Sequence, residues 1–279
     1  MQIFFVLILS YKYRVFGNKI SPAGLHCMLN SIAKTADLMQ YLRGKQSGQV
    51  SGMSGFDFIV RTKQDMIDAV ETFGFLPFFT CAVPGFSLEE HVARELWYSS
   101  GDEWEVWEWK GPVIRETGCA YGKFFENKAV FISREWFPDF ANYRRDGYDF
   151  DARYEDGLAS FKDKELYDLL DANAPISSRD LKRKGGYGKN GKTGFDTSVT
   201  HLQAQGYVTT SDFVYALDRN GNRYGWGIAE YTTPERRYGE EFTETVYRRT
   251  PGESYARLFE HISSMFPAAD ERTIRKLLK

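Results

Sequence analysis

The sequence predicts a mostly helical α+β fold, and three observations support this class. The 279 residues are 42% hydrophobic and 16% aromatic, which is typical of a soluble globular chain with one or two domains. Apolar side chains recur at helical spacing in several segments, and a strong hairpin signal, Asn220-Gly221, separates two runs rich in aromatic residues. The longest apolar run, residues 3–9, is far shorter than the roughly 20 residues that cross a bilayer, so we expect no contact with membranes.

The cysteines and histidines argue against a metal site. The three cysteines, Cys27, Cys81 and Cys119, match no zinc-binding spacing, and the four histidines are scattered. An odd number of cysteines leaves at least one unpaired, which favours a reducing, cytoplasmic setting. The acidic stretch over residues 146–156 lacks the ligand order of a calcium loop and is interpreted as a solvated face or linker. We therefore expect a cytoplasmic protein that holds no metal and no cofactor.

Residues 1–52 differ in composition from the rest of the chain. They carry six basic residues and one acidic residue, whereas residues 53–157 carry eleven basic and twenty acidic ones. Residues 44–55 are rich in Gly, Ser and Gln, which is typical of a linker. Three explanations fit this N-terminal extension: disorder, a wrongly chosen upstream start codon, or a loosely packed helical segment around residues 29–42. The sequence alone leaves all three open.

Residues 53–157 are predicted to form a helical, aromatic-rich domain. A first helix is expected over residues 62–73, followed by Gly74 as a stop signal. A capping box that begins at Ser87 predicts a second helix over residues 88–98. Five of the six tryptophans lie in this region, and we assign its aromatic side chains to a core, with a base-stacking pocket as the alternative.

Residues 158–235 show three helical patterns followed by a hairpin. The first is centred on residues 166–170, the second begins at Ser177, and the third spans residues 195–206. The pair Asn220-Gly221 then predicts a two-residue type I′ turn, because both residues tolerate a positive φ. Three helices followed by a hairpin is the order of a winged helix, a variant of the helix-turn-helix whose third helix can enter the major groove of DNA.

Two further modules complete the predicted organisation. The aromatic-rich region, residues 53–157, is expected to contain a partial second winged helix. In residues 236–279, apolar side chains from Tyr255 to Ile262 stand at helical spacing and predict an amphipathic helix, and Asp270 precedes a last short helix.

The predicted winged helix over residues 158–235 carries a nucleic-acid signal. Residues 179–192 contain six basic residues and one acidic residue, and such bases give salt-dependent affinity for phosphates. Polar side chains on the third helix could read base edges, and arginines at the tip of the hairpin could contact the DNA backbone or the minor groove. The expected contacts with double-stranded DNA are Arg179, Lys182, Arg183, Lys184, Lys189, Lys192, Thr197, Ser198, His201, Gln203, Arg219 and Arg223.

A second motif in the same stretch points to nucleotide binding, but its context contradicts it. Gly186, Gly191, Lys192 and Thr193 satisfy the pattern of a phosphate-binding loop. Such a loop must follow a buried parallel strand, and residues 178–185 hold a single apolar side chain. We therefore expect no nucleotide cofactor and interpret these residues as a basic loop.

Several ordered motifs resemble one known family. The segment Gly-Phe-Leu-Pro-Phe-Phe at residues 74–79 resembles the segment that introduces the catalytic motif of the AlkZ-like (YcaQ-like) winged-helix DNA glycosylases. Residues 128–133, followed by Trp-Phe-Pro at 136–138 and Arg-Arg at 144–145, are similar to the central signature of that family. The segment that begins Ile-Ser-Ser-Arg at residue 176 resembles its winged helix.

The resemblance covers roughly residues 62–230 and implies a tandem winged-helix protein that binds duplex DNA. In active members of the family, a Gln-x-Gln or Gln-x-Asp pair activates the water that cleaves the N-glycosidic bond of alkylated or crosslinked bases. The resemblance places Pro77 and Phe79 at those two positions, and neither side chain accepts a proton or orients water. The catalytic residues are thus unknown, and Glu89, Glu90 and Glu116 are the nearest carboxylates in the sequence.

Three hypotheses follow from these patterns. The first is a DNA-binding relative of the glycosylases that lacks their catalytic pair and acts in damage recognition or regulation. The second is an active glycosylase with a displaced catalytic residue. The third is a winged-helix module that binds other proteins and never contacts nucleic acid.

Overall fold

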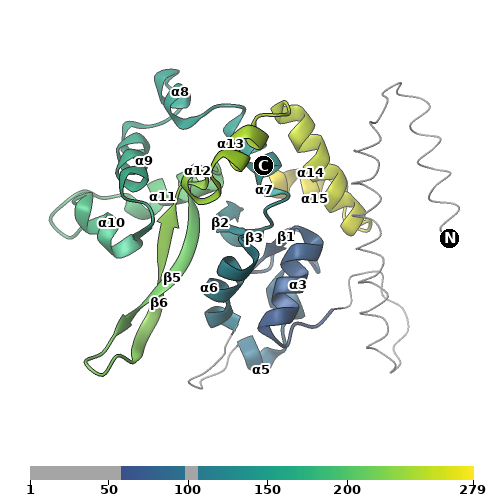
Figure 1. The fold of residues 1–279 in the computed structure, drawn as a ribbon. Coiled ribbons are helices and arrows are strands. Elements are labelled where there is room, and N and C mark those ends of the chain that lie inside the picture. Colours follow the sequence, from purple (N-terminus) through teal and green to yellow (C-terminus); the bar gives the residue numbers. More distant parts are fainter. Residues whose placement is uncertain (1–57, 98–105) are drawn as a thin grey trace, which may run out of the picture. The chain divides into compact units, whose positions relative to one another are not determined.

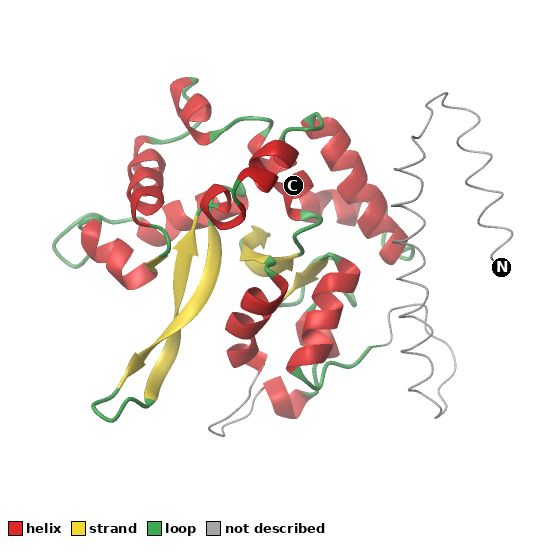
Figure 2. Ribbon diagram, viewed as in Figure 1, coloured by secondary structure: helices red, strands yellow, loops and turns green. Residues whose placement is uncertain are grey.

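The computed structural model describes residues 58–97 and 106–279. All described residues belong to one compact unit, Met53–Lys279. The predictions for residues 1–52 therefore fall outside the described residues. Two small antiparallel three-stranded sheets are surrounded by helices, which confirms the mixed α+β class (Figures 1 and 2). In the described part, no helix combines the length and the apolar character needed to cross a membrane.

The first sheet belongs to a module that begins with the predicted first helix. Thr62 caps this helix by accepting a hydrogen bond from the Asp65 amide, and Gly74 ends it at φ 73°. The strands pair in the order β1-β3-β2. The elements are α3 (Lys63–Phe73), β1 (Phe75–Pro77), α4 (Leu88–His91), α5 (Arg94–Trp97), α6 (Val106–Thr117), β2 (Ala120–Phe125) and β3 (Lys128–Ile132).

The single helix predicted over residues 88–98 is wrong. The capping box of Ser87 and Glu90 starts α4 as predicted, but the helix ends after His91 because Val92 adopts an extended conformation with ψ 137°. Val92 forms an isolated parallel bridge with Val60, a pairing that the local sequence does not encode. A second short helix, α5, then ends at Trp97, the last described residue before the gap.

The second winged helix repeats the topology of the first module. Its sheet order is β4-β6-β5, so the short strand before the second helix pairs with the last strand in both modules. The aromatic-rich region thus shares this strand order with the second module. The elements are α9 (Phe161–Asn173), β4 (Ile176–Ser177), α10 (Ser178–Lys184), α11 (Phe195–Ala204), β5 (Thr209–Leu217) and β6 (Arg223–Thr232).

The predicted hairpin exists, but its turn differs from the predicted one. The Gly221 amide donates to the Asp218 carbonyl at 3.1 Å, and Gly221 alone in this loop has a positive φ, 83°. This is a three-residue loop with glycine in the left-handed position, the next most common hairpin connection after the two-residue turns. Two consecutive positive φ angles, as in a type I′ turn, occur instead at Glu126 (49°) and Asn127 (58°), between β2 and β3.

Helices that precede and follow the second winged helix in the sequence complete the unit. Between the modules lie α7 (Phe137–Arg145) and α8 (Phe150–Glu155); after β6 come α12 (Pro234–Tyr238), α13 (Glu240–Val246), α14 (Pro251–Met265) and α15 (Glu271–Leu278). The amphipathic helix predicted in residues 236–279 is α14, and Asp270 caps α15 as predicted. Tryptophans 97 and 109 are buried in the core of the first module, as expected for a structural role.

One buried cation ties these helices to the second module. The Arg145 side chain on α7 is fully buried and donates to Glu235 Oε1 at 2.6 Å and to the Gly206 carbonyl at 2.8 Å. Its guanidinium lies 4.5 Å from the centre of the Tyr207 ring. Residues at the end of α11 are thereby held to α7 and α12 by one side chain.

Candidate nucleic-acid interface

The basic residues of α10 are placed by a short, well-capped helix. Ser177 Oγ accepts a hydrogen bond from the Asp180 amide at 3.1 Å, which starts the helix as predicted. Leu181 is fully buried, whereas Arg179, Arg183 and Lys184 are exposed. The last turn carries Lys182, Arg183 and Lys184, where cations also interact favourably with the helix dipole.

Half of the six basic residues in residues 179–192 form ion pairs with carboxylates of this chain. Lys182 lies 3.1 Å from Asp196, Arg183 lies 2.8 Å from Asp180, and Lys192 pairs with Glu165. The others are Arg179, Lys184 and Lys189, which are exposed and have no carboxylate partner among the described residues. These three cations are therefore free to neutralise phosphates without first breaking an ion pair.

The third helix of the second module is partly covered. Ser198 and Gln203 are buried, and Gln203 Oε1 accepts a hydrogen bond from the Lys123 amide of β2 at 3.3 Å. Their burial removes these two predicted residues from the accessible surface, because α11 packs against the sheet of the first module. Thr197 and His201 remain exposed, and His201 lies 3.6 Å from Asp163.

The packing of the two modules is reciprocal. The Tyr121 amide on β2 donates to Thr209 Oγ1 on β5 at 3.0 Å, so the corresponding strands lie side by side. The third helix of the first module, α6, lies against β5: Arg115 pairs with Asp212, and the Tyr215 hydroxyl donates to Glu108. In each module the helix that would enter a major groove is thus engaged by the other module.

The β5–β6 hairpin extends beyond the helices packed at its base (Figure 1). Arg219 lies in the exposed turn without a carboxylate partner in the described part, and the Arg223 guanidinium lies 5.0 Å from the centre of the Tyr215 ring. Two large aromatic side chains on β6 are exposed as well, Tyr224 by 58% and Trp226 by 80%. No local pattern marks either ring as exposed, although exposed aromatics beside cations are typical of nucleic-acid surfaces.

An open groove of about 600 Å³ lies between α10 and the hairpin. It brings together three of the predicted residues, Arg179, Arg183 and Lys184. Its opposite wall is formed by the hairpin strands, with apolar Val214 and Ile228. The exposed residues of α11 and the turn residue Arg219 do not line it.

The positions that the resemblance assigns to catalysis lie in an apolar environment. Pro77 is buried at the end of β1, where it pairs with Val130 of β3. Phe79 is half-buried, and its ring centre lies 5.7 Å from that of Trp107 and 6.1 Å from that of Trp97. Neither position presents a polar side chain to a water molecule.

The three candidate carboxylates each have a structural partner. Glu89 Oε2 accepts from the Thr80 amide at 2.9 Å, and Glu116 pairs with Lys63. Glu90 accepts from the amides of Gly85 and Ser87. Burial raises its pKa, but these hydrogen bonds and that from the Ser87 hydroxyl outweigh burial, so the pKa of Glu90 lies below its ordinary value. A low pKa is the opposite of what a general acid requires.

Lys110 on α6 is an unusual cation that the sequence analysis did not single out. Its ammonium lies 4.5 Å from the ring centre of Phe213, 4.9 Å from that of Trp107 and 5.6 Å from that of Phe78. Burial lowers the pKa of Lys110 to about 8, and the neighbouring Glu108 only partly opposes this shift. No local pattern identifies this site, because its rings come from three separate elements.

The phosphate-loop motif has the context that the sequence analysis expected. The residues that precede it form α10 rather than a buried parallel strand, and Lys192 is paired with Glu165 of α9. Among the described residues, no group of three or more His, Cys, Asp or Glu side chains is arranged to hold a metal ion.

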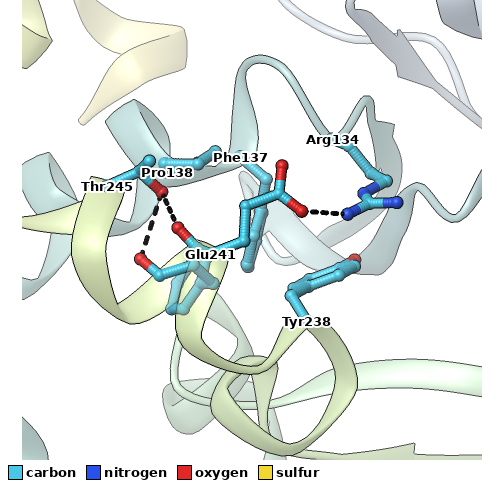
Figure 3. A pocket seen from close by; sticks show the side chains of 7 residues that line it. Arg134, Phe137, Pro138, Tyr238, Glu241 and Thr245 are labelled. Atoms are coloured by element: carbon cyan, nitrogen blue, oxygen red, sulfur yellow. Dashed lines mark hydrogen bonds and ion pairs between the residues drawn. The ribbon is translucent and has the colours of Figure 1, made fainter.

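A second cavity, between α7 and the helices after β6, is too small for a nucleotide. Its volume is about 30 Å³, close to that of one water molecule, and Arg134, Phe137, Tyr238 and Glu241 are among the side chains around it (Figure 3). Arg134 and Glu241 form an ion pair at 2.7 Å at its edge.

Comparison with known proteins places the chain in a family. Neither a search of curated proteins nor a search of solved structures finds a match. A family model described as AlkZ related matches residues 60–279, which is most of the chain and nearly all of the described part. The protein therefore belongs to the AlkZ-related family.

Proposed function

We propose that this protein binds DNA without cleaving N-glycosidic bonds, in damage recognition or regulation. The observation that carries the proposal is the set of exposed cations on α10, on the loop after it and at the tip of the hairpin. Arg179, Lys184, Lys189 and Arg219 have no carboxylate partner in the described part of the chain. Unpaired cations on neighbouring elements favour a polyanionic partner, and membership of the AlkZ-related family supports DNA as that partner.

The proposed loss of catalysis rests on the side chains around Pro77 and Phe79. Cleavage of a glycosidic bond requires a polar group that activates water and offsets the developing positive charge on the sugar. Here the neighbours of Phe79 are tryptophan rings, and the nearby carboxylates of Glu89 and Glu90 already accept backbone hydrogen bonds. This arrangement supports binding rather than hydrolysis.

A second candidate function is glycosylase activity with a displaced catalytic residue, and the position of Glu89 favours it over the other carboxylates. The Glu89 carboxylate is hydrogen-bonded to the amide of Thr80, the residue directly after Phe79. It is therefore the carboxylate that the structure brings next to the segment implied in catalysis.

One experiment separates these functions. The purified protein is incubated with plain and alkylated duplex DNA, binding is followed by fluorescence anisotropy, and the same samples are treated with alkali to cleave abasic sites. Binding without abasic sites is the result expected from the proposal. Abasic sites that disappear in Glu89→Gln would establish the second candidate. Absence of binding at low salt would refute both and leave a protein-interaction module.

A further inference from the structure

The groove between α10 and the hairpin has two chemically different walls. Arg179, Arg183 and Lys184 line one wall, and the outer face of the β5–β6 sheet forms the other. Its volume of about 600 Å³ is in the range of small-ligand sites and is far too small to enclose a double helix. A single strand or a protruding group can enter it, whereas a whole double helix cannot be enclosed.

The sheet wall is apolar and continues as an aromatic surface toward the hairpin tip. Val214 pairs with Ile228 and Ala216 pairs with Tyr224, and the register shifts between these two pairs. Directly paired residues of antiparallel strands lie on the same face. Tyr224 does not itself line the groove, but it shares a face with its partner Ala216, which does. Phe213 belongs to the opposite face, where its ring packs against Lys110 of α6. The groove face of the hairpin thus carries an exposed ring, while its other face is occupied.

The charged wall favours an anion. Arg183 is engaged with Asp180 at 2.8 Å, but Arg179 and Lys184 have no carboxylate partner among the described residues. Two acidic side chains also line the groove: Asp180, which pairs with Arg183, and Glu230 on the sheet wall, which accepts a hydrogen bond from Ser211 Oγ at 2.8 Å. The groove therefore offers two free cations on one side and apolar and aromatic contacts on the other.

An occupant that fits both walls carries phosphates and flat rings whose faces are accessible. In duplex DNA the faces of the bases are stacked on one another, whereas unpaired nucleotides expose them to aromatic side chains. The groove is also more accessible than the third helix, because Ser198 and Gln203 of α11 are buried against the first module.

We propose that this groove binds a short unpaired segment of a DNA strand, with phosphates on Arg179 and Lys184 and a base on the ring of Tyr224. The inference rests on the proposed DNA-binding function and specifies the structure of the DNA. Strand-separated or bulged DNA is then preferred over perfect duplex, and the preference comes from the sheet wall rather than from the cations.

The test compares a perfect duplex with the same duplex carrying a short central bubble, using fluorescence anisotropy with the full chain. Stacking of a base on an aromatic ring contributes enough affinity for the bubble to bind about tenfold more tightly. Tyr224→Ala lowers affinity for the bubble by about the same tenfold factor and so abolishes the preference. The ring is 58% exposed, so its removal leaves the core intact. Replacing both Arg179 and Lys184 by Ala weakens binding to both DNAs.

The matched control is Phe161→Ala, which removes another exposed ring, 68% exposed, at the start of α9 and outside the groove. It leaves both affinities unchanged. Equal affinity for duplex and bubble, or a bubble preference that persists in Tyr224→Ala, would overturn the groove assignment while DNA binding itself stands. If neither DNA binds, the proposed function is refuted as well.

Discussion

The salt dependence of DNA binding is the sharpest quantitative consequence of the charge arrangement. Four exposed cations, Arg179, Lys184, Lys189 and Arg219, have no carboxylate partner in the described part. Each cation that neutralises a phosphate of duplex DNA contributes about −0.9 to the slope of log K against log salt, so four give a slope of roughly −3.6. Between about 50 and 200 mM salt, the affinity then falls roughly 150-fold.

The perturbation is the double replacement of Arg179 and Lys184 by Ala. Two cations remain, so the slope becomes roughly −1.8 and the same salt change lowers affinity only about 12-fold. Anisotropy titrations of labelled duplex across a salt series give both slopes. The matched control replaces Arg272 and Lys276, two exposed cations of α15, and keeps the slope of the unmodified protein.

Two results would refute this reasoning. If the double variant keeps the slope of the unmodified protein, the α10 cations do not contact phosphates. If the α15 control flattens the slope as much as the α10 variant does, the effect reflects net charge rather than a local surface. The paired cations Lys182, Arg183 and Lys192 are expected to contribute less, because each must first lose its carboxylate partner.

The remaining predictions concern stability and two individual side chains. Arg145→Met leaves the buried Gly206 carbonyl without a donor and should lower the free energy of unfolding by roughly 3–5 kcal/mol in urea titrations. The control, Arg134→Met, breaks an exposed ion pair and should lower it by less than about 1 kcal/mol. Similar losses in the two variants would contradict the role assigned to burial. The pKa of the Lys110 amine is lowered to about 8, so this amine should react with amine-selective reagents as the pH rises through 8. Exposed lysines lose their protons only at a much higher pH. Mass spectrometry that shows Lys110 unlabelled until about pH 10 would contradict this prediction. Gly74→Ala should destabilise the first module, because Gly74 has φ 73° and an added Cβ would lie 2.3 Å from the Trp136 ring; an unchanged urea midpoint would argue against that close packing.

The features that sequence reasoning predicted correctly are those set by neighbouring residues. The caps at Thr62, Ser87 and Ser177 form hydrogen bonds within three or four residues, so their side chains and amides meet in any chain that starts a helix there. Helical periodicity likewise located α11 and α14, and the basic cluster on α10 follows from composition alone.

Predictions from local motifs failed where a residue outside the motif decided the conformation. The helix expected over residues 88–98 is interrupted at Val92, which pairs with Val60. The turn at Asn220-Gly221 is compatible with more than one hairpin geometry, and the side chain of Asp218, which accepts from the amides of Asn220 and Asn222 at 2.8 Å, stabilises the longer loop. Neither outcome can be derived from the dipeptide or the capping residues by themselves.

The sequence by itself therefore determined the helices, their caps, the hairpin and the cations of α10, because these depend on interactions within a few residues. Only the tertiary structure decided which of those residues are accessible. Gln203 is covered because its side chain accepts a hydrogen bond from the Lys123 amide of β2. Lys110 is shielded from water because rings from α6, from β5 and from Phe78, just after β1, surround it. Burial depends on surfaces brought together from distant parts of the chain. A periodic pattern within one segment does not predict which other segment will pack against it.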